Sequence, residues 1–339
     1  MEKLFIISNE SIFNYEGSFF CDNIDLKSTP EGLNNKFEVN LIGRESKKIR
    51  SHRINIKNIK IYRNFLSYLL GIFKSLKEKQ SKYLIISISP FTFAACILIK
   101  FFNKKPIMYL RSDGHGEYKA IFGFFGPIIY SFMFNIVATI SNLISCTDYI
   151  LKGKKGKVIL PSQLDLSWLR KSKAVAIKSF KLLYVGRVRV EKGIFSLANI
   201  IRNKRNISLT IVGADKKSLN SINQNNIKIF PLVNNKTKLM KFYDDHNIFI
   251  LPSFTEGHPM VLLESLARRR PVIIFNEIEH VIGDKRGIFV AKRNFLSFLA
   301  SLNHIKKNYK KIQSEIRKNK LPTNKEFIDK FVKLINKYN

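Results

Sequence analysis

The sequence predicts an α/β protein with two doubly wound parallel sheets, one in each of two domains. Short apolar, β-branched runs alternate with helical stretches, and this alternation pauses at a polar, basic gap, Asp165–Lys181, before it starts again. Strands that are buried on both faces are continuously apolar, so both sheets are expected to be parallel and covered by helices. A length of 339 residues also favours two domains over a single core.

The strand-like runs divide between the two sides of the gap. Before it they are Lys3–Ser8, Glu38–Gly43, Tyr83–Ser89, Pro106–Leu110 and Asn142–Thr147, with a weaker sixth at Lys157–Pro161. After it they are Lys181–Gly186, Ser208–Gly213, Ile227–Leu232, Ile248–Ser253, Pro271–Phe275 and Gly287–Ala291. The remainder, Phe295–Tyr338, has the pattern of Lys-rich helices. We therefore expect domains at residues 1–165 and 166–323, and a helix at 324–339 that packs back on the first domain.

The net charge of +34 is spread over both halves of the chain and is not a basic tail. It predicts an anionic partner, which is a nucleic acid, an anionic membrane surface or a phosphate-bearing ligand. The three cysteines, Cys21, Cys96 and Cys146, lack the spacing of a metal site and favour a reducing compartment. The apolar run in "MEKLFIISNE" is too short for a signal peptide, so we expect a cytoplasmic protein.

Residues Ala120–Thr147 contain no charged side chain and are long enough to cross a bilayer. Gly123, Gly126 and Pro127 near the start of this segment, and polar residues within it, oppose a continuous transmembrane helix. A buried or membrane-surface helix followed by a short strand is the favoured interpretation, and a transmembrane helix is the alternative.

The stretch "LLYVGRVRVEKGIFSL" places two cations directly after a predicted strand. The strand ends at Gly186, where the missing side chain lets the backbone approach a ligand closely. Arg187 and Lys192 follow, spaced so that both reach one anion, the first as a planar fork and the second as a point charge. The alternative is a solvated basic loop.

The stretch "SFTEGHPMVLLES" places two carboxylates on either side of a predicted helix start. Pro259 is expected as the first helical residue, so that the free N–H groups of Met260–Leu262 form an anion site. Glu264 leans back toward that site, and Glu256 lies on the loop before it. The two glutamates would bracket a diphosphate and accept hydrogen bonds from hydroxyls at its ends. The alternative is a surface glutamate and a Glu264–Arg268 pair.

Together these motifs resemble the retaining, nucleotide-sugar-dependent glycosyltransferases of family 4 (glycosyl transferases group 1). Their GT-B fold has two Rossmann-like domains that face each other across a cleft. The match covers Lys181–Ala291 through "YVGRVRVEKG", "LTIVGAD", "FILPSFTEGHPMVLLES" and "RPVI". The first domain matches in outline, through Gly17 in "NYEGSFF" and through "ISCTDYILKGKKGKVILPSQLD". The chain departs from the family at Arg269, where a glycine is common, in "PSQLD", which lacks Asn-Gly, and in "IVGADKK", which lacks a second glycine.

The resemblance assigns roles to these positions. Implied catalytic residues are Glu256, Arg187, Lys192, His115 and Asp113. Implied donor-binding residues are Gly17, Gly186, Gly213, His258, Pro259, Met260, Val261 and Glu264. In "MYLRSDGHGEY", either Asp113 or His115 touches the transferred sugar, or Asp113-Gly114 is simply a turn.

The reaction implied by the resemblance is transfer of a sugar from a nucleotide diphosphate with its anomeric configuration retained. Arg187, Lys192 and the helix N-terminus would stabilise the charge that develops on the leaving diphosphate. The sequence has no Asp-x-Asp motif and no spaced His or Cys set, so neither a metal nor another cofactor is expected. The resemblance favours a front-face route, in which the donor phosphate assists deprotonation of the acceptor, over a covalent carboxylate nucleophile.

The acceptor is predicted from the first domain. Residues Arg63–Lys82 are amphipathic, and "PFTFAACILIKFFNKK" and the uncharged segment follow them. Such segments bind anionic lipid surfaces, with core packing as the alternative. We expect a peripheral enzyme on the inner face of the cytoplasmic membrane, with a lipid-linked or polysaccharide acceptor in lipopolysaccharide, O-antigen or capsule assembly. Lys74, Lys77, Lys79 and Lys82 are expected near lipid headgroups.

Two other function classes are compatible with the composition. The first is a soluble glycosyltransferase or phosphorylase that acts on free oligosaccharides. The second is a basic nucleic-acid-binding protein without catalysis, but the chain has no zinc, helix-turn-helix or RNP-like signature and its charge is diffuse. A nucleic acid is therefore not expected as a partner.

Overall fold

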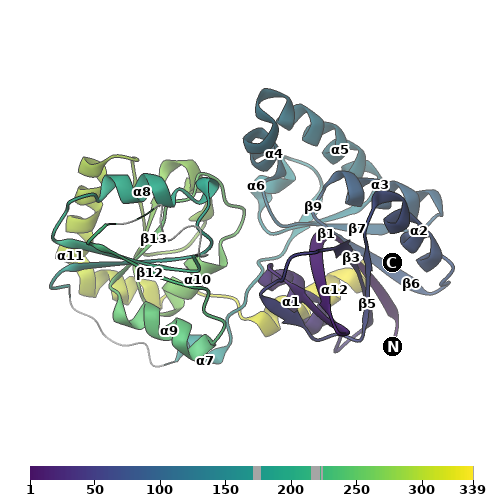
Figure 1. Ribbon diagram of the computed structural model, residues 1–339, viewed down its shortest axis with the longest axis horizontal. Helices are drawn as coiled ribbons and strands as arrows, with labels where there is room; N and C mark the ends of the chain where they lie inside the picture. The colour runs from purple at the N-terminus through teal and green to yellow at the C-terminus, as the bar shows by residue number, and fades with distance from the viewer. Residues whose placement is uncertain (171–176, 215–221, 223, 339) are drawn as a thin grey trace. The chain divides into compact units, whose positions relative to one another are not determined.

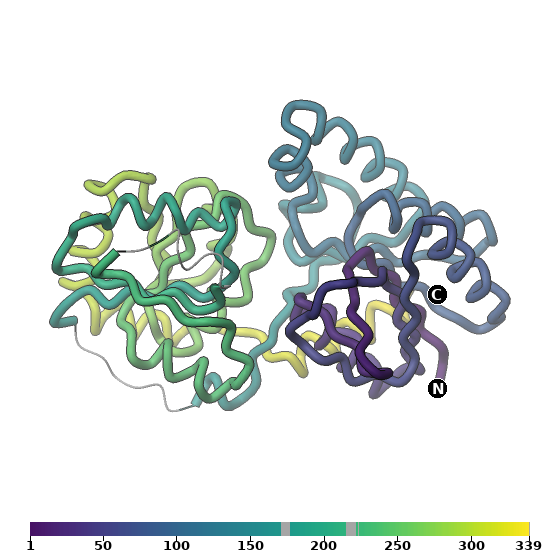
Figure 2. The backbone as a smooth tube through the Cα atoms, in the orientation of Figure 1, coloured from purple at the N-terminus to yellow at the C-terminus, as the bar shows by residue number. Residues whose placement is uncertain are grey.

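The computed structural model describes residues 1–170, 177–214, 222 and 224–338. The chain divides into two compact units, one formed by Met1–Pro161 with Asn324–Asn339 and the other by Ser162–Thr323. The boundaries expected from the sequence, after residues 165 and 323, lie close to both points of division. Figures 1 and 2 show that each unit is a twisted sheet covered by helices.

The first unit contains a 9-stranded sheet among its described residues. Its parallel part runs in the order β5 (Asn58–Tyr62), β3 (Glu38–Glu45), β1 (Lys3–Tyr15), β6 (Ser81–Ile86), β7 (Pro106–Leu110), β8 (Asn142–Ser145), β9 (Gly156–Val158). The far end of β1 bends into an antiparallel ribbon with β2 (Ser18–Cys21) and β4 (His52–Ile54). Since β1 lies between β3 and β6, the strand order reverses there, and the carboxyl ends of β1 and β6 form a topological switch point.

Helices cover both faces of this sheet. On one face α2 (Phe65–Ser75), α3 (Pro90–Phe101) and α5 (Gly126–Ile140) pack against Phe5 and Ile7 of β1. On the other face α1 (Ile24–Leu33) and α12 (Asn324–Lys337) pack against Leu4 and Ile6. Successive side chains of a strand point to opposite faces, so the continuous apolar run at the start of β1 is what two helical layers require.

The strand prediction for the first unit was incomplete. Strands β2, β4 and β5 were not predicted, because the alternating exposure of an edge strand leaves polar residues such as Asn58 and Lys60 in its pattern. The run Tyr83–Ser89 was predicted too long, because Ser87 adopts a left-handed conformation (φ 59°) that ends β6 at Ile86. Residues Pro90–Phe101 then form α3, which begins with a capping box between Ser89 and Thr92.

The uncharged segment forms a helical hairpin. Residues Gly114–Ile140 are long and apolar enough to cross a membrane, but they form α4 (Gly114–Phe122), the 3₁₀ turn η1 (Gly123–Phe125) and α5. The chain reverses at Gly123, which has φ 60°. A Cβ atom on Gly126 would lie 1.9 Å from the carbonyl oxygen of Tyr118, so the two helix backbones are in close contact at that point. The predicted alternative of one continuous transmembrane helix is therefore wrong for this structure.

Lys82 was expected at a lipid surface, and the structure contradicts this. Its side chain is 5% exposed, and its Nζ atom lies 2.9 Å from a carboxylate oxygen of Glu2 and 2.7 Å from the amide oxygen of Asn336 in α12. It thus lies on the face opposite to α2 and α3. Lys74, Lys77 and Lys79 are exposed. Lys82 belongs to β6, and its side chain points toward α12. The sequence pattern does not show which face of a strand a side chain lies on, so it grouped Lys82 with the three exposed lysines.

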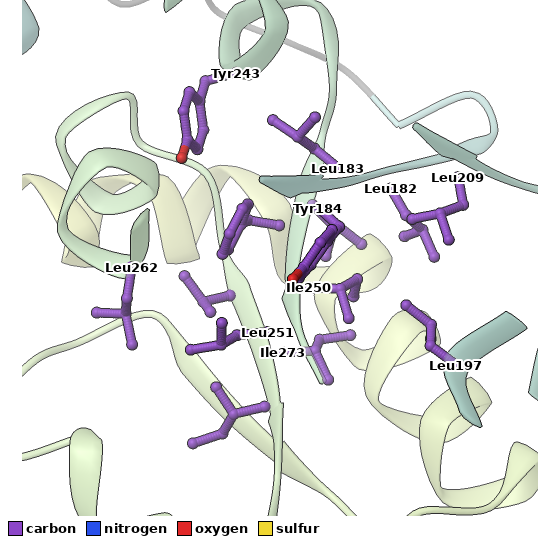
Figure 3. Packing of buried hydrophobic residues seen from close by; sticks show 14 of the residues in the cluster. Leu182, Leu183, Tyr184, Leu197, Leu209, Tyr243, Ile250, Leu251, Leu262 and Ile273 are labelled. Carbon is purple, nitrogen blue, oxygen red and sulfur yellow. The ribbon is translucent and has the colours of Figure 1, made fainter. Parts of the chain in front are cut away.

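The second unit contains a 6-stranded, fully parallel sheet among its described residues. Its order is β12 (Ile227–Phe230), β11 (Ile207–Val212), β10 (Phe180–Val185), β13 (Ile248–Leu251), β14 (Val272–Phe275), β15 (Ile288–Ala291). All six strands were predicted, which confirms the doubly wound α/β fold class. Leu182 and Tyr184 of β10, Ile250 of β13 and Leu262 lie in one buried cluster (Figure 3).

The helical elements of this unit are short, apart from one. They are α7 (Leu166–Leu169), η2 (Val190–Lys192), α8 (Ile194–Ile200), α9 (Lys236–Asp245), α10 (Met260–Ala267), η3 (Asn276–Val281) and α11 (Phe295–Arg317). In Figure 1, α8 covers one face of the sheet and α9 the other. The strand order reverses between β10 and β13, which pair directly. Their carboxyl ends are therefore the position where a doubly wound sheet binds its ligand.

Candidate functional site

The candidate donor site lies at the switch point of the second unit. Parallel strands β10 and β13 are neighbours, with Leu182 opposite Ile248, so the loops that leave them emerge side by side. The loop after β10 carries Arg187 and Lys192, and the loop after β13 carries Glu256. Topology thus brings together two motifs that are more than sixty positions apart in the chain.

Close backbone packing holds the two loops together. A Cβ atom on Gly193 (φ 65°) would lie 1.9 Å from the carbonyl oxygen of Pro252, and one on Gly213 (φ 107°) 2.7 Å from that of Gly186. The N–H group of Phe254 donates to the carbonyl oxygen of Glu191 at 2.9 Å. Only glycine fits at Gly193 and Gly213, because each combines a left-handed conformation with a close backbone contact. Gly186 and Gly213 thus serve the packing of neighbouring loops, and their donor-binding role stays a prediction.

The structure pairs Lys192 with Glu256. The Lys192 Nζ atom lies 2.7 Å from Oε1 of Glu256, and the Ser253 hydroxyl donates to the same oxygen at 2.6 Å. The sequence predicted separate roles for the two charged residues, one on a diphosphate and the other on a sugar hydroxyl. Because one carboxylate oxygen takes both donors, the orientation of Glu256 is fixed, and Oε2 is the oxygen that remains for a ligand hydroxyl.

Arg187 differs from Lys192 in its surroundings. Its side chain is exposed and makes no hydrogen bond or ion pair within the described part of the chain. Its backbone is fixed, because the buried Tyr184 hydroxyl donates to the Arg187 carbonyl oxygen at 2.8 Å. Arg187 therefore has a rigid base and a guanidinium group that is available to an anion.

Helix α10 begins one residue later than predicted. Pro259 is its N-cap, with extended backbone (φ −74°, ψ 113°), and Met260 is the first helical residue. The Leu262 N–H group donates to the Pro259 carbonyl oxygen at 3.2 Å, so it does not belong to the predicted anion site. The N–H groups of Met260 and Val261 remain at the helix end, where the helix dipole favours negative charge. His258 is half-buried and directly precedes this turn.

Glu264 lies in α10 and accepts a hydrogen bond from the Tyr243 hydroxyl at 2.7 Å. Burial raises the pKa of the Glu264 carboxyl group to about 7, and the Tyr243 hydrogen bond only partly offsets this. The group therefore exchanges its proton near neutral pH. A ligand that donates hydroxyl hydrogen bonds to it would favour the ionised form.

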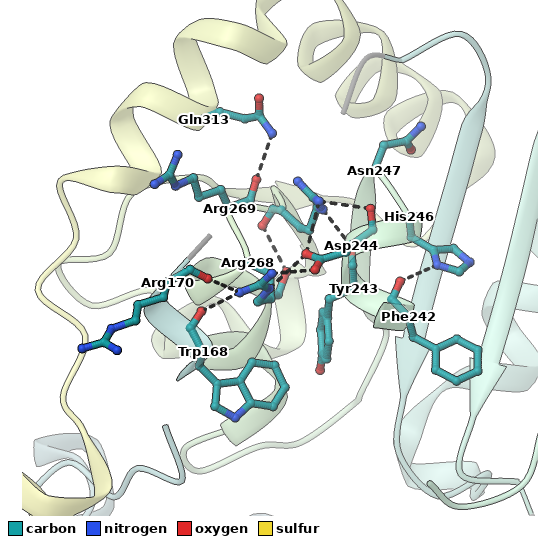
Figure 4. Close-up of polar contacts among 12 residues, drawn as sticks. Trp168, Arg170, Phe242, Tyr243, Asp244, His246, Asn247, Arg268, Arg269 and Gln313 are labelled. Carbon is teal, nitrogen blue, oxygen red and sulfur yellow. Dashed lines mark hydrogen bonds and ion pairs between the residues drawn. The ribbon is translucent and has the colours of Figure 1, made fainter. Parts of the chain in front are cut away.

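The predicted alternative for Glu264 was a pair with Arg268. Figure 4 shows that the buried Arg268 guanidinium faces Asp244, with contacts of 2.9 and 2.5 Å. It also donates to the carbonyl oxygens of Trp168 and Arg170 at 3.0 and 2.8 Å. Arg268 thus anchors the end of α10 to α9 and α7. This fixes the helix whose other end forms the candidate anion site.

In the first unit, Asp113 and His115 lie at the carboxyl end of β7, next to each other. Helix α4 begins at Gly114, so Asp113 is a helix N-cap and the alternative of a simple turn is wrong. Tyr149 donates to one Asp113 carboxylate oxygen at 3.4 Å; the other is buried without a hydrogen-bond partner within the described residues. His115 Nδ1 lies 3.9 Å from that second oxygen, and burial lowers the pKa of His115. These two residues could face a sugar together.

Gly17 occupies a different kind of position. It forms, with Glu16, the tight turn between β1 and β2, where both residues have positive φ (47° and 78°). A Cβ atom there would meet no other atom within 4 Å. The turn explains the glycine, and its donor-binding role stays a prediction.

Several residues of the donor site carried no sequence signal. Arg293, which follows β15, stacks its guanidinium on the rings of Phe254 and Phe275 at 4.0 and 4.3 Å. It also donates to the carbonyl oxygen of Pro252 at 3.0 Å and pairs with Glu277 at 2.7 Å. His280 contacts the Glu256 carbonyl oxygen at 2.7 Å. These contacts hold the Glu256 loop in place. They join residues that are distant in the sequence, so no local sequence pattern predicts them.

The described residues contain no group of three or more His, Cys, Asp or Glu side chains placed to hold a metal ion. Metal independence of the reaction stays a prediction.

Comparison with known proteins finds a family match for the second unit. Residues 169–321 match the model of the family described as Glycosyl transferases group 1. The matched region includes the loops after β10 and β13 and helix α10. The second unit is therefore similar to Glycosyl transferases group 1 domains, in agreement with the motifs found in its sequence.

A curated relative aligns over part of the chain. The capsular polysaccharide biosynthesis glycosyltransferase CapM of Staphylococcus aureus is 30% identical over 131 residues, which cover 34% of this chain and 34% of CapM. The matches to curated relatives cover 27% to 39% of the relatives' own length.

Solved structures match over nearly the whole chain. Anabaena HepE, determined in complex with UDP and glucose, has a TM-score of 0.71 at 11% identity and covers 99% of this chain and 100% of its own. WaaG, described as a glycosyltransferase involved in lipopolysaccharide biosynthesis, has a TM-score of 0.66 at 14% identity and covers 98% and 99%. At these identities the likeness establishes the fold, which is that of parallel-sheet, Rossmann-like domains as in GT-B glycosyltransferases.

Proposed function

We propose that this protein is a retaining glycosyltransferase of family 4. It would move a sugar from a nucleotide-diphosphate donor to a glycan or lipid-linked glycan in the assembly of a cell-surface polysaccharide. One observation carries the proposal. Within the region that matches the Glycosyl transferases group 1 family, the switch point between β10 and β13 gathers Arg187, Lys192, Glu256 and the N-terminus of α10.

Each of these groups has a role in the proposed reaction. Arg187 and Lys192 bind the diphosphate and stabilise the charge that develops on it as the glycosidic bond breaks. The N–H groups at the start of α10 add to this stabilisation. Glu264 accepts hydrogen bonds from the ribose, and Glu256 accepts them from the transferred sugar. These cations and amides take the role that a metal ion has in other transferases, and we propose that no metal is required.

The acceptor is proposed from the relatives and from the first unit. CapM is described by its role in capsular polysaccharide biosynthesis and WaaG by its role in lipopolysaccharide biosynthesis. The helices α2 and α3 of this chain expose large apolar side chains, and lysines lie at their ends. An enzyme that is peripheral on the inner face of the cytoplasmic membrane, with a lipid-linked acceptor, accounts for these features together.

The test is an assay of the purified protein with a panel of UDP-, GDP- and other nucleotide sugars, with and without a chelator. We expect release of one nucleoside diphosphate, unaffected by the chelator, and a product whose anomeric configuration, determined by NMR, equals that of the donor. Inversion of the configuration would refute retention alone. Phosphate-dependent release of sugar phosphate from an oligosaccharide, without use of any nucleotide sugar, would instead identify a phosphorylase.

A further inference from the structure

The hairpin of α4, η1 and α5 carries an apolar tip that no other described element covers. Between Ala120 and Thr147 the chain has no charge, and most of the apolar stretch within Gly114–Ile140 is not buried. A core helix as apolar as this would be mostly buried. Side chains at the tip are exposed, with Phe124 at 81% and Phe125 at 67%. The exposed large apolar side chains on the hairpin are Ile121, Phe122, Phe124, Phe125, Ile128, Ile129 and Phe132.

The hairpin is a rigid element. The backbone contact at Gly126 and the seating of the Tyr130 ring against Gly114 hold α4 and α5 together. The Tyr118 and Tyr130 rings lie 5.2 Å apart between the two helices. The tip is therefore presented on a fixed support, and no rearrangement of the fold is needed to expose it.

We propose that the tip of this hairpin inserts into the acyl-chain region of an anionic bilayer, and that the outer faces of α2 and α3 lie on the same bilayer. The proposal rests on the membrane-surface part of the proposed function and specifies the inserted element. Helix α3 packs on both α2 and α5, so the three helices form one layer over the sheet. Along α2 and α3 this layer also exposes Phe65, Leu66, Leu70, Phe73, Ile97, Phe101 and Phe102.

Charge selects a lipid surface over a second copy of the chain. Exposed lysines flank the apolar layer: Lys74, Lys77, Lys79, Lys100, Lys105 and Lys119. Two chains of net charge +34 would repel each other, whereas anionic headgroups attract each lysine near them. Apolar side chains ringed by lysines have the pattern of an interfacial membrane anchor.

The geometry also relates the bilayer to the candidate site. His115 lies in the first turn of α4, and its ring packs on Tyr130 and Phe134 at the base of the hairpin. From His115 to Phe122, the last residue of α4, a helix rises roughly 10 Å. Interfacial elements enter a bilayer by roughly 5 to 10 Å, so an inserted tip leaves His115 at the level of the headgroups. A lipid-linked sugar would meet the first unit at that level.

Insertion can be tested with a Phe124→Trp reporter and vesicles of phosphatidylglycerol and phosphatidylcholine whose acyl chains carry bromine. The wild type has one tryptophan, Trp168, which is buried in the second unit and serves as the background. We expect bromine to quench the reporter but not the wild type. A Tyr15→Trp variant, exposed on the β1–β2 ribbon, is the matched control and should not be quenched.

A second measurement uses the double variant Phe124→Ser, Phe125→Ser, which should bind these vesicles at least about tenfold more weakly with unchanged unfolding. Vesicle binding without quenching of the reporter would overturn the insertion of the hairpin tip, but it would still agree with the proposed binding to an anionic membrane surface. A wild type that binds no vesicle, or whose tip is instead covered in a dimer seen by sedimentation, would overturn it as well. Donor hydrolysis, measured in parallel, decides the proposed catalytic function separately.

Discussion

At the residue scale, the contact between Lys192 and Glu256 is the main result for the chemistry. In the free site each of these charges neutralises the other, at 2.7 Å. With Oε1 held by Lys192 and Ser253, Oε2 of Glu256 would accept a hydrogen bond from a sugar hydroxyl while Lys192 also contacts the donor diphosphate. Ser253 and Arg293 keep the loop in position. Arg187, which has no side-chain hydrogen bond or ion pair within the described residues, would provide the first contact to the diphosphate.

Arg187→Ala and Lys192→Ala should each reduce turnover on the order of a hundredfold or more, because each removes a preorganised contact to the leaving diphosphate. Lys192→Ala should also lower the affinity for the sugar part of the donor, since Glu256 loses one of its two donors. Steady-state kinetics with the true donor measures both effects. Arg189→Ala, an exposed neighbour in the same loop, is the matched control and should retain near-normal turnover. Full activity in both site variants would exclude this assignment.

Glu264→Gln should weaken the binding of free nucleoside diphosphate and leave kcat mostly unchanged, because a ribose contact changes little as the bond breaks. The wild-type pKa of about 7 adds a pH signature. Below that pH the carboxyl group is protonated, so wild-type affinity should rise with pH up to about 7 more steeply than that of Glu264→Gln. Calorimetric titrations at several pH values compare the two proteins. Parallel curves would contradict the ribose role.

The same carboxyl group predicts how stability depends on pH. Its folded-state pKa is raised from 4.5 to about 7, so between these values the folded protein holds a proton that the unfolded chain has released. The contribution of Glu264 to stability is therefore greatest at acidic pH and falls as pH rises to about 7, by up to about 3 kcal/mol. Urea unfolding from pH 5 to pH 8 should show this decline in the wild type and a flatter profile in Glu264→Gln.

At the element scale, the end of α10 shows what a motif can and cannot predict. Arg269 was noted as a departure because related sequences often have glycine there, and the structure gives the reason for that glycine. Arg269 follows the helix C-cap with φ 55°, a left-handed conformation that favours glycine. The motif thus identified a special backbone position, while the contacts of Arg268 and Arg293 depended on residues that no local pattern connects.

Arg269→Gly should raise the free energy of unfolding by about 1 kcal/mol, because glycine adopts the left-handed conformation without the cost of a side chain. Arg269→Ala removes the same charge and keeps that cost, so it should give no comparable gain. Denaturant unfolding of the three proteins measures the difference. An equal gain in both variants would show that charge, not backbone conformation, is responsible.

Arg293 predicts how the Glu256 loop is supported. Arg293→Lys keeps the positive charge, but it loses the stacking of the planar guanidinium on Phe254 and the hydrogen bond from that group to the Pro252 carbonyl oxygen. We expect a loss of kcat on the order of tenfold with little change in nucleoside diphosphate affinity, because the cations Arg187 and Lys192 lie on another loop and the α10 end is anchored separately by Arg268. Kinetics and nucleotide titration together distinguish this from a general loss of folding, which would lower both. The exposed pair of Arg286 with Glu315 offers a control in Arg286→Lys.

At the scale of the whole molecule, the sequence predicted two parallel sheets but not the organisation of the apolar surface. Six strands of the second unit were readable because buried parallel strands are continuously apolar. The positions of the four lysines expected at the membrane could not be predicted in the same way. Lys82 lies in a strand that faces α12, and a strand's two faces cannot be assigned until its partners are known.

Replacing Lys74, Lys77 and Lys79 by Gln should therefore release the protein from anionic vesicles at physiological ionic strength. Each contributes roughly 1 kcal/mol near such a surface, so partitioning should fall on the order of a hundredfold. Lys82→Gln is the matched control. It should leave vesicle binding unchanged. It should instead lower the free energy of unfolding, because Glu2 and Asn336 lose the ammonium group that they contact in the folded protein. Vesicle sedimentation at low and high salt measures binding, and equal sedimentation of triple variant and wild type would contradict the surface.

The return of α12 to the first unit has a consequence for synthesis of the chain on the ribosome. Phe327 and Phe331 are almost fully buried in the same cluster as Leu4 and Ile6, so the part of this sheet face that α1 does not cover stays exposed until α12 has been translated. The second unit, Ser162–Thr323, has all its residues before that point. The first unit is thus completed after the second, and a nascent chain exposes part of an apolar sheet face while the second unit, about half of the chain, is translated.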